Sequence, residues 1–473
     1  MSGRALWERG KRKNSVRLYP YYVPQMPTSD LNRSPGRTKS PPLNLIGNTR
    51  RDIMTAVLNK RPNEVFTPRQ AEVNMDMYVH RPDHEKKLRR WLDEAMHGFI
   101  FGESGSGKTW LYKSFFALHR VNYKVANCAL ASSKGSLRNE IFSACCPDLK
   151  SIKTGYTESK DASINLMGVL NGGLGHEGVY ELIQDDLLIT SFQKLQQESI
   201  GWGRSVIVLD NVEAIFSNET IMDELAEIII LLDDERYSRF DVKFLIVGVP
   251  CGVIEYFSKS KNRSSVSNRI TELPAVFGFT LEETKQVVRK GFNELLGAKF
   301  GDLTIKGLAG RVHDITLGVP QRVHEYCLSL AYECEEDNYT SISKSMLNNA
   351  NIDWLTKGLR ESYSVIEQHF SGGKGQIRRK QVLYIIGQYK GHQFSTSEIG
   401  LMLKSEFPSE APESDSGVGS ILSSLAKGNS PILVRNEING SYTFRDPRHI
   451  MCLRIILSKT HDNSIAKLPF IRN

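Results

Sequence analysis

The sequence lacks any stretch that approaches the ~18 consecutive apolar residues required for a membrane-spanning helix. Apolar runs such as residues 228–232 are short and flanked by charged residues. The basic N-terminus, with Arg4, Arg9 and Lys11, is followed by neither an apolar segment nor a small-residue cleavage site, so no secretory signal is expected. We therefore expect a soluble, cytoplasmic protein that does not enter a membrane.

The seven cysteines also lack the paired spacing of a zinc or redox motif. They are Cys128, Cys145, Cys146, Cys251, Cys327, Cys334 and Cys452. Cys145 and Cys146 form the only close pair, and adjacent cysteines rarely satisfy the geometry of a disulfide or a zinc site. We expect buried or incidental thiols and no structural metal.

Charge is distributed unevenly along the chain. Residues 1–61 contain thirteen lysines and arginines against three acidic residues, a local net charge of +10. Since the whole chain carries +8, the remainder carries about −2. Residues 1–74 are predicted to form a basic, largely extended arm, because proline recurs there and periodicity is weak. Such an arm can neutralise the phosphates of a nucleic acid or remain a solvated tail, and both readings stay open here.

Apolar strands alternate with amphipathic helices over residues 75–280, which predicts a parallel sheet covered by helices on both faces. The expected strands are 99–101, 123–130, 206–209 and 244–247. The expected helices are 83–92, 108–120, 135–146, 180–198 and 221–232, with a Gly-, Ser- and Lys-rich excursion at 150–178. The fold class is therefore α/β.

Two further regions follow the predicted sheet. Residues 281–371 have almost entirely helical patterns, at 282–296, 305–316, 319–335 and 343–370. Residues 372–473 show three helices at 379–389, 397–406 and 416–427, two strands at 431–435 and 441–444, and a last helix at 449–458. Asn439-Gly440 is a strong hairpin signal between the strands. Three helices followed by a hairpin predict a winged-helix domain.

A phosphate-binding loop lies between the first strand and its helix. It matches the pattern G-x-x-x-x-G-K-[ST] and consists of Gly102, Glu103, Ser104, Gly105, Ser106, Gly107, Lys108 and Thr109. Glycines let the backbone wrap so that its N–H groups and the helix N-terminus cradle phosphates. Lys108 is expected to reach the β- and γ-phosphates, and the Thr109 hydroxyl to bind Mg²⁺.

The metal also requires a carboxylate, and the apolar strand before Asp210 places one at a strand end. The alternative for Asp210 is a helix N-cap. Glu213 is the nearest downstream carboxylate and the best candidate to polarise an attacking water.

These motifs resemble those of the AAA+ ATPases, and within them the origin-recognition and cell-division-control initiators together with the related STAND signalling ATPases. The resemblance covers roughly residues 75–470 and implies ATP and Mg²⁺ as cofactors. It also implies a helical lid after the P-loop sheet. Most such enzymes carry Glu directly after the metal-binding Asp, whereas this chain has Asn211. Slow hydrolysis is therefore expected, with Glu213 as a substitute.

Three further positions follow from the resemblance. The strand at 243–249 looks like the sensor-1 strand, but Gly248 stands where the family has a polar tip, so that role is unassigned. Arg263 and Arg269 lie where similar proteins place a finger on a neighbouring subunit's nucleotide, and Arg269 is favoured. Arg322 resembles a sensor-2 arginine that would contact the γ-phosphate, although Pro320 also fits a simple helix start.

The C-terminal region has fourteen lysines and arginines against eight acidic residues between positions 372 and 473. The expected DNA-binding residues are Arg378, Arg379, Lys380, Lys427, Arg435 and Arg445. The third helix offers few base-reading side chains, so contacts mostly with the backbone of double-stranded DNA are expected. A winged helix used only for protein contacts is the alternative.

The leading hypothesis is an ATP-controlled DNA-binding AAA+ protein, associated with the nucleoid, that forms a homo-oligomer or an assembly with other proteins. A STAND-type signalling ATPase that oligomerises on activation is the rival hypothesis. A transposon-type target-selecting ATPase is a third.

Overall fold

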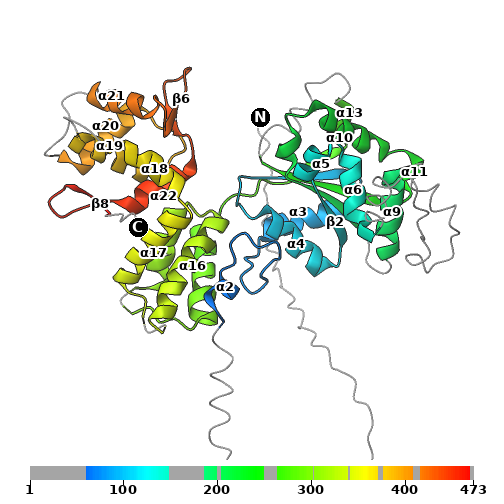
Figure 1. Ribbon diagram of the computed structural model, residues 1–473, viewed down its shortest axis with the longest axis horizontal. Helices are drawn as coiled ribbons and strands as arrows, with labels where there is room; N and C mark the ends of the chain where they lie inside the picture. The colour runs from blue at the N-terminus through cyan, green and yellow to red at the C-terminus, as the bar shows by residue number, and fades with distance from the viewer. Residues whose placement is uncertain are drawn as a thin grey trace, which may run out of the picture. The chain divides into compact units, whose positions relative to one another are not determined.

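The computed structural model describes residues 60–148, 186–199, 204–249, 264–301, 303–338, 341–370, 376–408 and 416–468 (Figure 1). All of them belong to one unit, Thr55–Asn473. Most of the basic arm, the excursion at 150–178 and Arg263 lie outside the described residues. Within these ranges, no helix is long and apolar enough to cross a membrane.

Five strands form one parallel sheet in the order β2-β3-β4-β1-β5. Their bounds are β1 His97–Phe101, β2 Asn122–Asn127, β3 Ser205–Asp210, β4 Val242–Gly248 and β5 Ile270–Glu272. The carboxyl ends of parallel strands meet at one edge of a sheet. This edge therefore carries both the loop that follows β1 and Asp210 at the end of β3, as the predicted α/β fold requires.

Helices cover both faces of the sheet, because the strand residues alternate between two apolar cores (Figure 1). Val206 and Val208 pack with α3 (Pro82–Asp93) and α4 (Lys108–His119). Ile207 and Leu209 pack on the other face. The helices there are α5 Cys128–Lys134, α6 Leu137–Cys145, α9 Leu187–Glu198 and α10 Glu219–Leu231.

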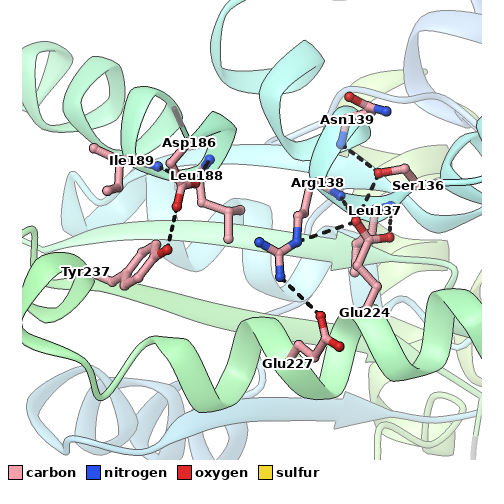
Figure 2. Close-up of polar contacts among 10 residues, drawn as sticks. All are labelled: Ser136, Leu137, Arg138, Asn139, Asp186, Leu188, Ile189, Glu224, Glu227 and Tyr237. Carbon is pink, nitrogen blue, oxygen red and sulfur yellow. Dashed lines mark hydrogen bonds and ion pairs between the residues drawn. The ribbon is translucent and has the colours of Figure 1, made fainter. Parts of the chain in front are cut away.

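Two expected boundaries differ from the structure because polar side chains cap helices. The strand expected at 123–130 ends at Asn127, whose side chain accepts a hydrogen bond from Ala129 N and starts α5. In the helix expected at 180–198, α9 begins at Leu187 after the N-cap Asp186. Figure 2 shows Asp186 accepting hydrogen bonds from two α9 amides and from the Tyr237 hydroxyl. Residues 180–185 lie outside the described ranges.

A carboxylate from α10 caps α6 in the same region (Figure 2). Glu224 accepts hydrogen bonds from the Ser136 hydroxyl at 2.9 Å and from the backbone N–H groups of Leu137 at 2.6 Å and Arg138 at 3.0 Å. A negative charge at a helix N-terminus is favourable, because the first N–H groups have no intrahelical partner. The Arg138 side chain also contacts Glu227 at 3.3 Å, so α6 and α10 are held together.

The region after the sheet is helical, as expected. Its helices are α14 Leu281–Val288, α15 Ile305–Thr316, α16 Pro320–Glu336, α17 Lys344–Lys357 and α18 Arg360–Gln368. The helix expected at 282–296 continues from α14 into a π-helical segment, η3, Arg289–Leu295. The helix expected at 343–370 is two helices, separated at Gly358 and Leu359.

The end of the expected N-terminal arm is not extended. Pro62–Val65 forms a short helix, α2, and Val65 and Phe66 are fully buried. The Phe66 ring centre lies 4.9 Å from that of Phe292 in η3. Residues 60–74 therefore contribute to the core of the helical region, because burying Phe66 outweighs leaving this stretch solvated.

The C-terminal region has the element order of a winged helix. It comprises α19 Gln376–Gln388, α20 Thr396–Glu406, α21 Ser416–Leu425, β6 Leu433–Arg435, β7 Tyr442–Phe444 and α22 Pro447–Ile456. Strands β6 and β7 pair antiparallel, and Phe394 forms a bridge to Tyr442. A second hairpin, β8 Leu457–Lys459 with β9 Ile465–Lys467, was not expected from the sequence. The expected fold class is confirmed, while domain boundaries at 74/75, 280/281 and 371/372 stay predictions.

Candidate nucleotide-binding site

The phosphate-binding loop joins β1 to α4, and its glycines are required by geometry. Gly107 has φ +92°, a left-handed conformation that favours glycine. A Cβ on Gly102 would lie 2.3 Å from the Val276 carbonyl oxygen. Gly107 is the N-cap of α4 and offers no side-chain cap, so the first N–H groups of that helix are left for a ligand.

Lys108 folds back over the loop. Its Nζ donates hydrogen bonds to the carbonyl oxygens of Gly102 at 2.7 Å and Glu103 at 2.9 Å. Burial lowers the pKa of Lys108, and the nearby carboxylates of Glu213 and Asp210 oppose that shift. The lysine thus stands in the loop as a cation facing two carboxylates, which suits a group placed between phosphates and a metal ion.

Asp210 lies at the carboxyl edge of the sheet, as its motif predicts. Its Oδ1 accepts a hydrogen bond from Asn211 N at 2.9 Å, and its Oδ2 accepts one from the Tyr112 hydroxyl at 3.3 Å. Burial raises the pKa of Asp210, although the same two hydrogen bonds lower it in part. The carboxylate is not consumed by a helix cap, since Asn211 rather than Asp210 precedes the short helix η2, Val212–Ile215.

Glu213 lies in η2 and faces the same cavity as Lys108 and Asp210. Its Oε2 is buried and has no hydrogen-bond partner among the described residues. Gly248 at the end of β4 allows this approach, because a Cβ there would lie 2.4 Å from Val212 Cγ1 and 3.2 Å from Glu213 Oε2. An unpaired buried carboxylate oxygen is available to accept a proton or a hydrogen bond from water.

The cavity has a volume of about 310 Å³. Five of the loop residues line it, namely Ser104, Gly105, Gly107, Lys108 and Thr109, together with Asp210 and Glu213. The structure therefore brings the two expected motifs together. Gly102, Glu103 and Ser106 shape the loop without lining the cavity.

Mg²⁺ would depend on Thr109 and Asp210 together with phosphate oxygens. In the described ranges, no group of three or more His, Cys, Asp or Glu side chains could hold a metal ion alone. A hydroxyl and one carboxylate are oxygen ligands of the kind Mg²⁺ prefers, and this ion commonly takes its remaining ligands from substrate phosphates and water. The residues present thus fit the ion.

A second wall of the cavity was missed by sequence reasoning. It consists of residues 67–70, Tyr78, Val79 and Arg81, together with Trp110, Phe279, Pro320, Gln321 and His324. These segments are mostly irregular or at helix starts and carry no motif of fixed spacing. Among these residues only Pro320 had a local signal, its fit to a helix start.

Arg322 does not line the cavity. Its Nη1 donates to Glu325 Oε2 at 2.6 Å. Burial alone would raise the pKa of Glu325, but donors from Gln321, Arg322 and Trp354 together lower it. Arg69, which lines the cavity, also contacts Glu325 at 3.2 Å.

Arg269 lies away from the cavity of its own chain. It directly precedes β5, at the amino edge of the sheet, whereas the loop follows the carboxyl end of β1. Its Nε donates to Asp233 Oδ2 at 2.6 Å. A role for Arg269 toward a neighbouring subunit stays a prediction.

The expected DNA-binding residues fall into two groups. Lys427, Arg435 and Arg445 are exposed. Arg435 is the last residue of β6, beside the turn, whereas Arg445 follows β7 at the opposite end of the hairpin, where its backbone N–H donates to the Ile432 carbonyl at 2.9 Å. Arg378, Arg379 and Lys380 are half-buried in α19. Arg379 donates to the Ser424 hydroxyl of α21 at 2.8 Å, so it ties two helices together.

Residues 89–257 match the family model described as "AAA domain". This part of the chain is therefore similar to AAA domains. This match confirms the AAA part of the resemblance drawn from the motifs. No curated protein matches the sequence.

Several solved structures are similar to this chain. Cdc6p from Pyrobaculum aerophilum is 15% identical, with 84% of this chain and 97% of that chain covered and a TM-score of 0.42. The Aeropyrum pernix ORC1 protein in complex with DNA is 16% identical, with 84% and 96% covered and a TM-score of 0.38. The Aeropyrum pernix ORC2 protein, in ADPNP–ADP complexes, is 14% identical, with 84% and 97% covered and a TM-score of 0.46.

Proposed function

We propose that this protein is an ATP-controlled DNA-binding AAA+ ATPase, either initiator-like or associated with a mobile element or defence. The observation that carries the proposal is a set of contacts running from the phosphate-binding loop to the winged helix. Gln321 N, at the start of α16, donates to the Gly105 carbonyl at 3.2 Å. The lid thus contacts the loop backbone directly.

The second half of this connection lies between α15 and α22. Arg454 of α22 is buried, and its Nη1 donates to the Asp314 carbonyl in α15 at 2.6 Å. Its other nitrogens donate to the carbonyls of Gly387 at 2.6 Å and Tyr389 at 3.1 Å. A cation at a helix C-terminus is favourable, and these contacts join α22 to the C-terminal ends of α15 and α19. Nucleotide that shifts α16 would therefore also shift the winged helix.

ATP acts chiefly as a switch in this proposal. Lys108 and Thr109 contact its phosphates and Mg²⁺, Asp210 holds the metal, and Glu213 activates water slowly. Arg322 is released from Glu325 to contact the γ-phosphate, and Arg269 completes the site of a neighbouring copy in an oligomer. We also propose a domain division into residues 1–74, 75–280, 281–371 and 372–473.

DNA is bound by the exposed cations of the wing and by Lys427, with the basic arm adding phosphate contacts. Arg378, Arg379 and Lys380 of α19 add further contacts with DNA in this proposal. Arg435 pairs across the hairpin with Tyr442, and its guanidinium lies 6.0 Å from that ring centre. An exposed arginine beside the hairpin turn suits contacts with the phosphate backbone.

The decisive experiment reverses both wing charges, with Arg435→Glu and Arg445→Glu combined. We expect DNA affinity, measured by fluorescence anisotropy with ATP and at two salt concentrations, to fall by about tenfold or more, because attraction to phosphate becomes repulsion. ATP affinity should not change. The matched control combines Lys86→Glu with Arg89→Glu on α3, which changes net charge equally on another exposed surface. Equal losses in both variants would mean a net-charge effect and would remove the wing from the proposal.

One observation favours the rival function, a signalling ATPase whose winged helix binds a protein. Ile438 at the hairpin tip is 97% exposed and follows the acidic Glu437. An exposed apolar tip beside a carboxylate suits a protein surface as well as a groove of DNA. If the parent protein binds no DNA at physiological salt with ATP present, this reading replaces the first.

A further inference from the structure

The base-binding part of the nucleotide site is not specified by its motifs. The phosphate-binding loop contacts phosphates through its backbone and Lys108, and these groups are common to all nucleoside triphosphates. Selectivity for one base must come from other residues of the cavity. The second wall offers two side chains with unused hydrogen-bonding capacity.

Arg81 is the first of these side chains. It is only 8% exposed and lines the cavity. Its Nη1 donates to the Phe277 carbonyl at 2.9 Å, and its guanidinium carbon lies 5.2 Å from the centre of the Phe279 ring. Its Nη2 is buried without a hydrogen-bond partner in the described part of the chain. One N–H donor of a fixed guanidinium therefore remains for a ligand.

Thr67 is the second. It is 4% exposed and lines the same cavity. Its backbone N–H donates to His324 Nδ1 at 3.4 Å, which fixes the position of the residue. Its hydroxyl oxygen is buried and, as far as the described residues reach, also has no partner. A hydroxyl can both accept and donate a hydrogen bond.

The surroundings of these two groups suit a flat heterocycle. Trp110, Phe279 and Pro320 line the cavity beside them. His324 is buried and neutral, since burial lowers its pKa to about 4, and its ring lies 5.3 Å from that of Trp110. Apolar and aromatic walls with a few placed polar groups are typical of small-molecule sites.

Buried polar groups are rarely left unpaired in native proteins, so two such atoms in one cavity indicate a ligand that completes them. We propose that Arg81 and Thr67 select adenine: the Arg81 Nη2 donates to a ring nitrogen of the base, and the Thr67 hydroxyl accepts from its 6-amino group. This inference rests on the proposed nucleotide-binding function of the same cavity. It assigns base specificity to two residues that both lie before residues 89–257, the part of the chain that matches the AAA model.

The test measures the affinity of the full chain for ATP, for its 1-deaza, 3-deaza and 7-deaza analogues, and for purine riboside triphosphate, which lacks the 6-amino group. In the parent protein, one deaza analogue and the riboside should each bind about 10- to 100-fold more weakly than ATP. Arg81→Met, which keeps an apolar contact with Phe279, should weaken ATP binding and abolish the difference between ATP and the deaza analogue. Thr67→Val should abolish the penalty for losing the amino group.

One further variant separates base reading from other roles. Lys108→Ala is the control for the phosphate end and should weaken ATP and the analogues by the same factor. If Arg81→Met does not fold, the measurements on Thr67→Val alone test whether the cavity selects adenine. Equal affinities of the parent protein for ATP and every analogue would overturn base selection while leaving nucleotide binding intact. A parent protein that binds no nucleotide would overturn the site as well. If Arg81→Met keeps the parent's ratios, Arg81 acts on the fold or the phosphates rather than the base.

Discussion

At the scale of single residues, the site combines a complete phosphate-binding loop with an asparagine directly after Asp210. Asn211 follows Asp210 and adopts φ +60°, a left-handed conformation that asparagine tolerates better than most residues. This conformation turns the chain directly into η2, whose first turn carries Glu213. The Glu213 carboxylate therefore reaches the cavity from three residues after Asp210, two positions beyond Asn211.

Glu213→Gln is predicted to leave ATP affinity nearly unchanged and to slow hydrolysis. The substitution keeps the size of the side chain but removes the group that accepts a proton from water, so a loss of about 100-fold in phosphate release is expected. Steady-state phosphate release and ATP titration of the same preparation measure the two effects.

The control for this prediction is Glu219→Gln, an exposed position in the first turn of α10 that should leave turnover unchanged. Unaltered hydrolysis in Glu213→Gln would show that another group, or no side chain, activates the water.

At the scale of elements, the end of β4 and the start of η2 meet at Gly248. The backbone of Gly248 also accepts a hydrogen bond from Gly102 N at 3.3 Å. One glycine thus joins the loop after β1 and the helix after β3. A side chain at this position would overlap Val212, since an added Cβ would lie 2.4 Å from Val212 Cγ1.

Gly248→Ala is accordingly predicted to displace Glu213 by crowding η2. We expect hydrolysis to fall together with a destabilisation of about 1–3 kcal/mol, a usual range for an added methyl group in a packed core. Urea denaturation and phosphate release provide the two readouts.

The matched glycine variant is Gly310→Ala in α15, where an added Cβ meets nothing within 4 Å. It should be neutral or stabilise by up to about 1 kcal/mol. A Gly248→Ala protein with full stability and full activity would contradict the steric account.

At the scale of the whole molecule, buried neutral histidines lie in both the sheet region and the helical region. His97 is in β1 and accepts a hydrogen bond from Phe244 N at 3.2 Å. His324 is in α16. Burial lowers the pKa of each ring from 6.5 to about 4, with nearby Lys243 adding to the shift at His97.

Stability should therefore fall as the pH decreases from about 6.5 to about 4. In that window the unfolded chain binds protons at these rings and the folded chain does not, so acid favours unfolding; above pH 6.5 the effect is absent. Each ring contributes a slope of up to about 1.4 kcal/mol per pH unit. Urea unfolding at pH 7.5, 6.0 and 5.0 measures it.

Replacing one ring tests the assignment. His324→Gln should reduce the pH dependence of the unfolding free energy by the contribution of one ring, up to about 1.4 kcal/mol per pH unit. A pH profile that is identical in His324→Gln and the parent would show that His324 does not contribute.

The sequence by itself determined the features that depend on short-range spacing. The loop from Gly102 to Thr109 could be predicted because its glycines and lysine act within eight consecutive residues. Asp210 could be predicted because a buried strand ends there, and the winged helix because the turn signal at Asn439-Gly440 separates two strands. The sheet followed from alternating elements, since connections between parallel strands require helices.

Only the tertiary structure decided which residues line the rest of the cavity. His324 lies more than 200 residues after Thr67 and Arg81 in the sequence. Nothing local marks Thr67 or Arg81 as neighbours of a phosphate loop. Phe66 similarly belongs to the core because it packs against Phe292, which is distant in the sequence. The Arg322 side chain forms an ion pair with Glu325, three residues further along α16, and does not line the cavity. Such contacts arise when distant segments bury their surfaces together, and no spacing rule in the sequence encodes them.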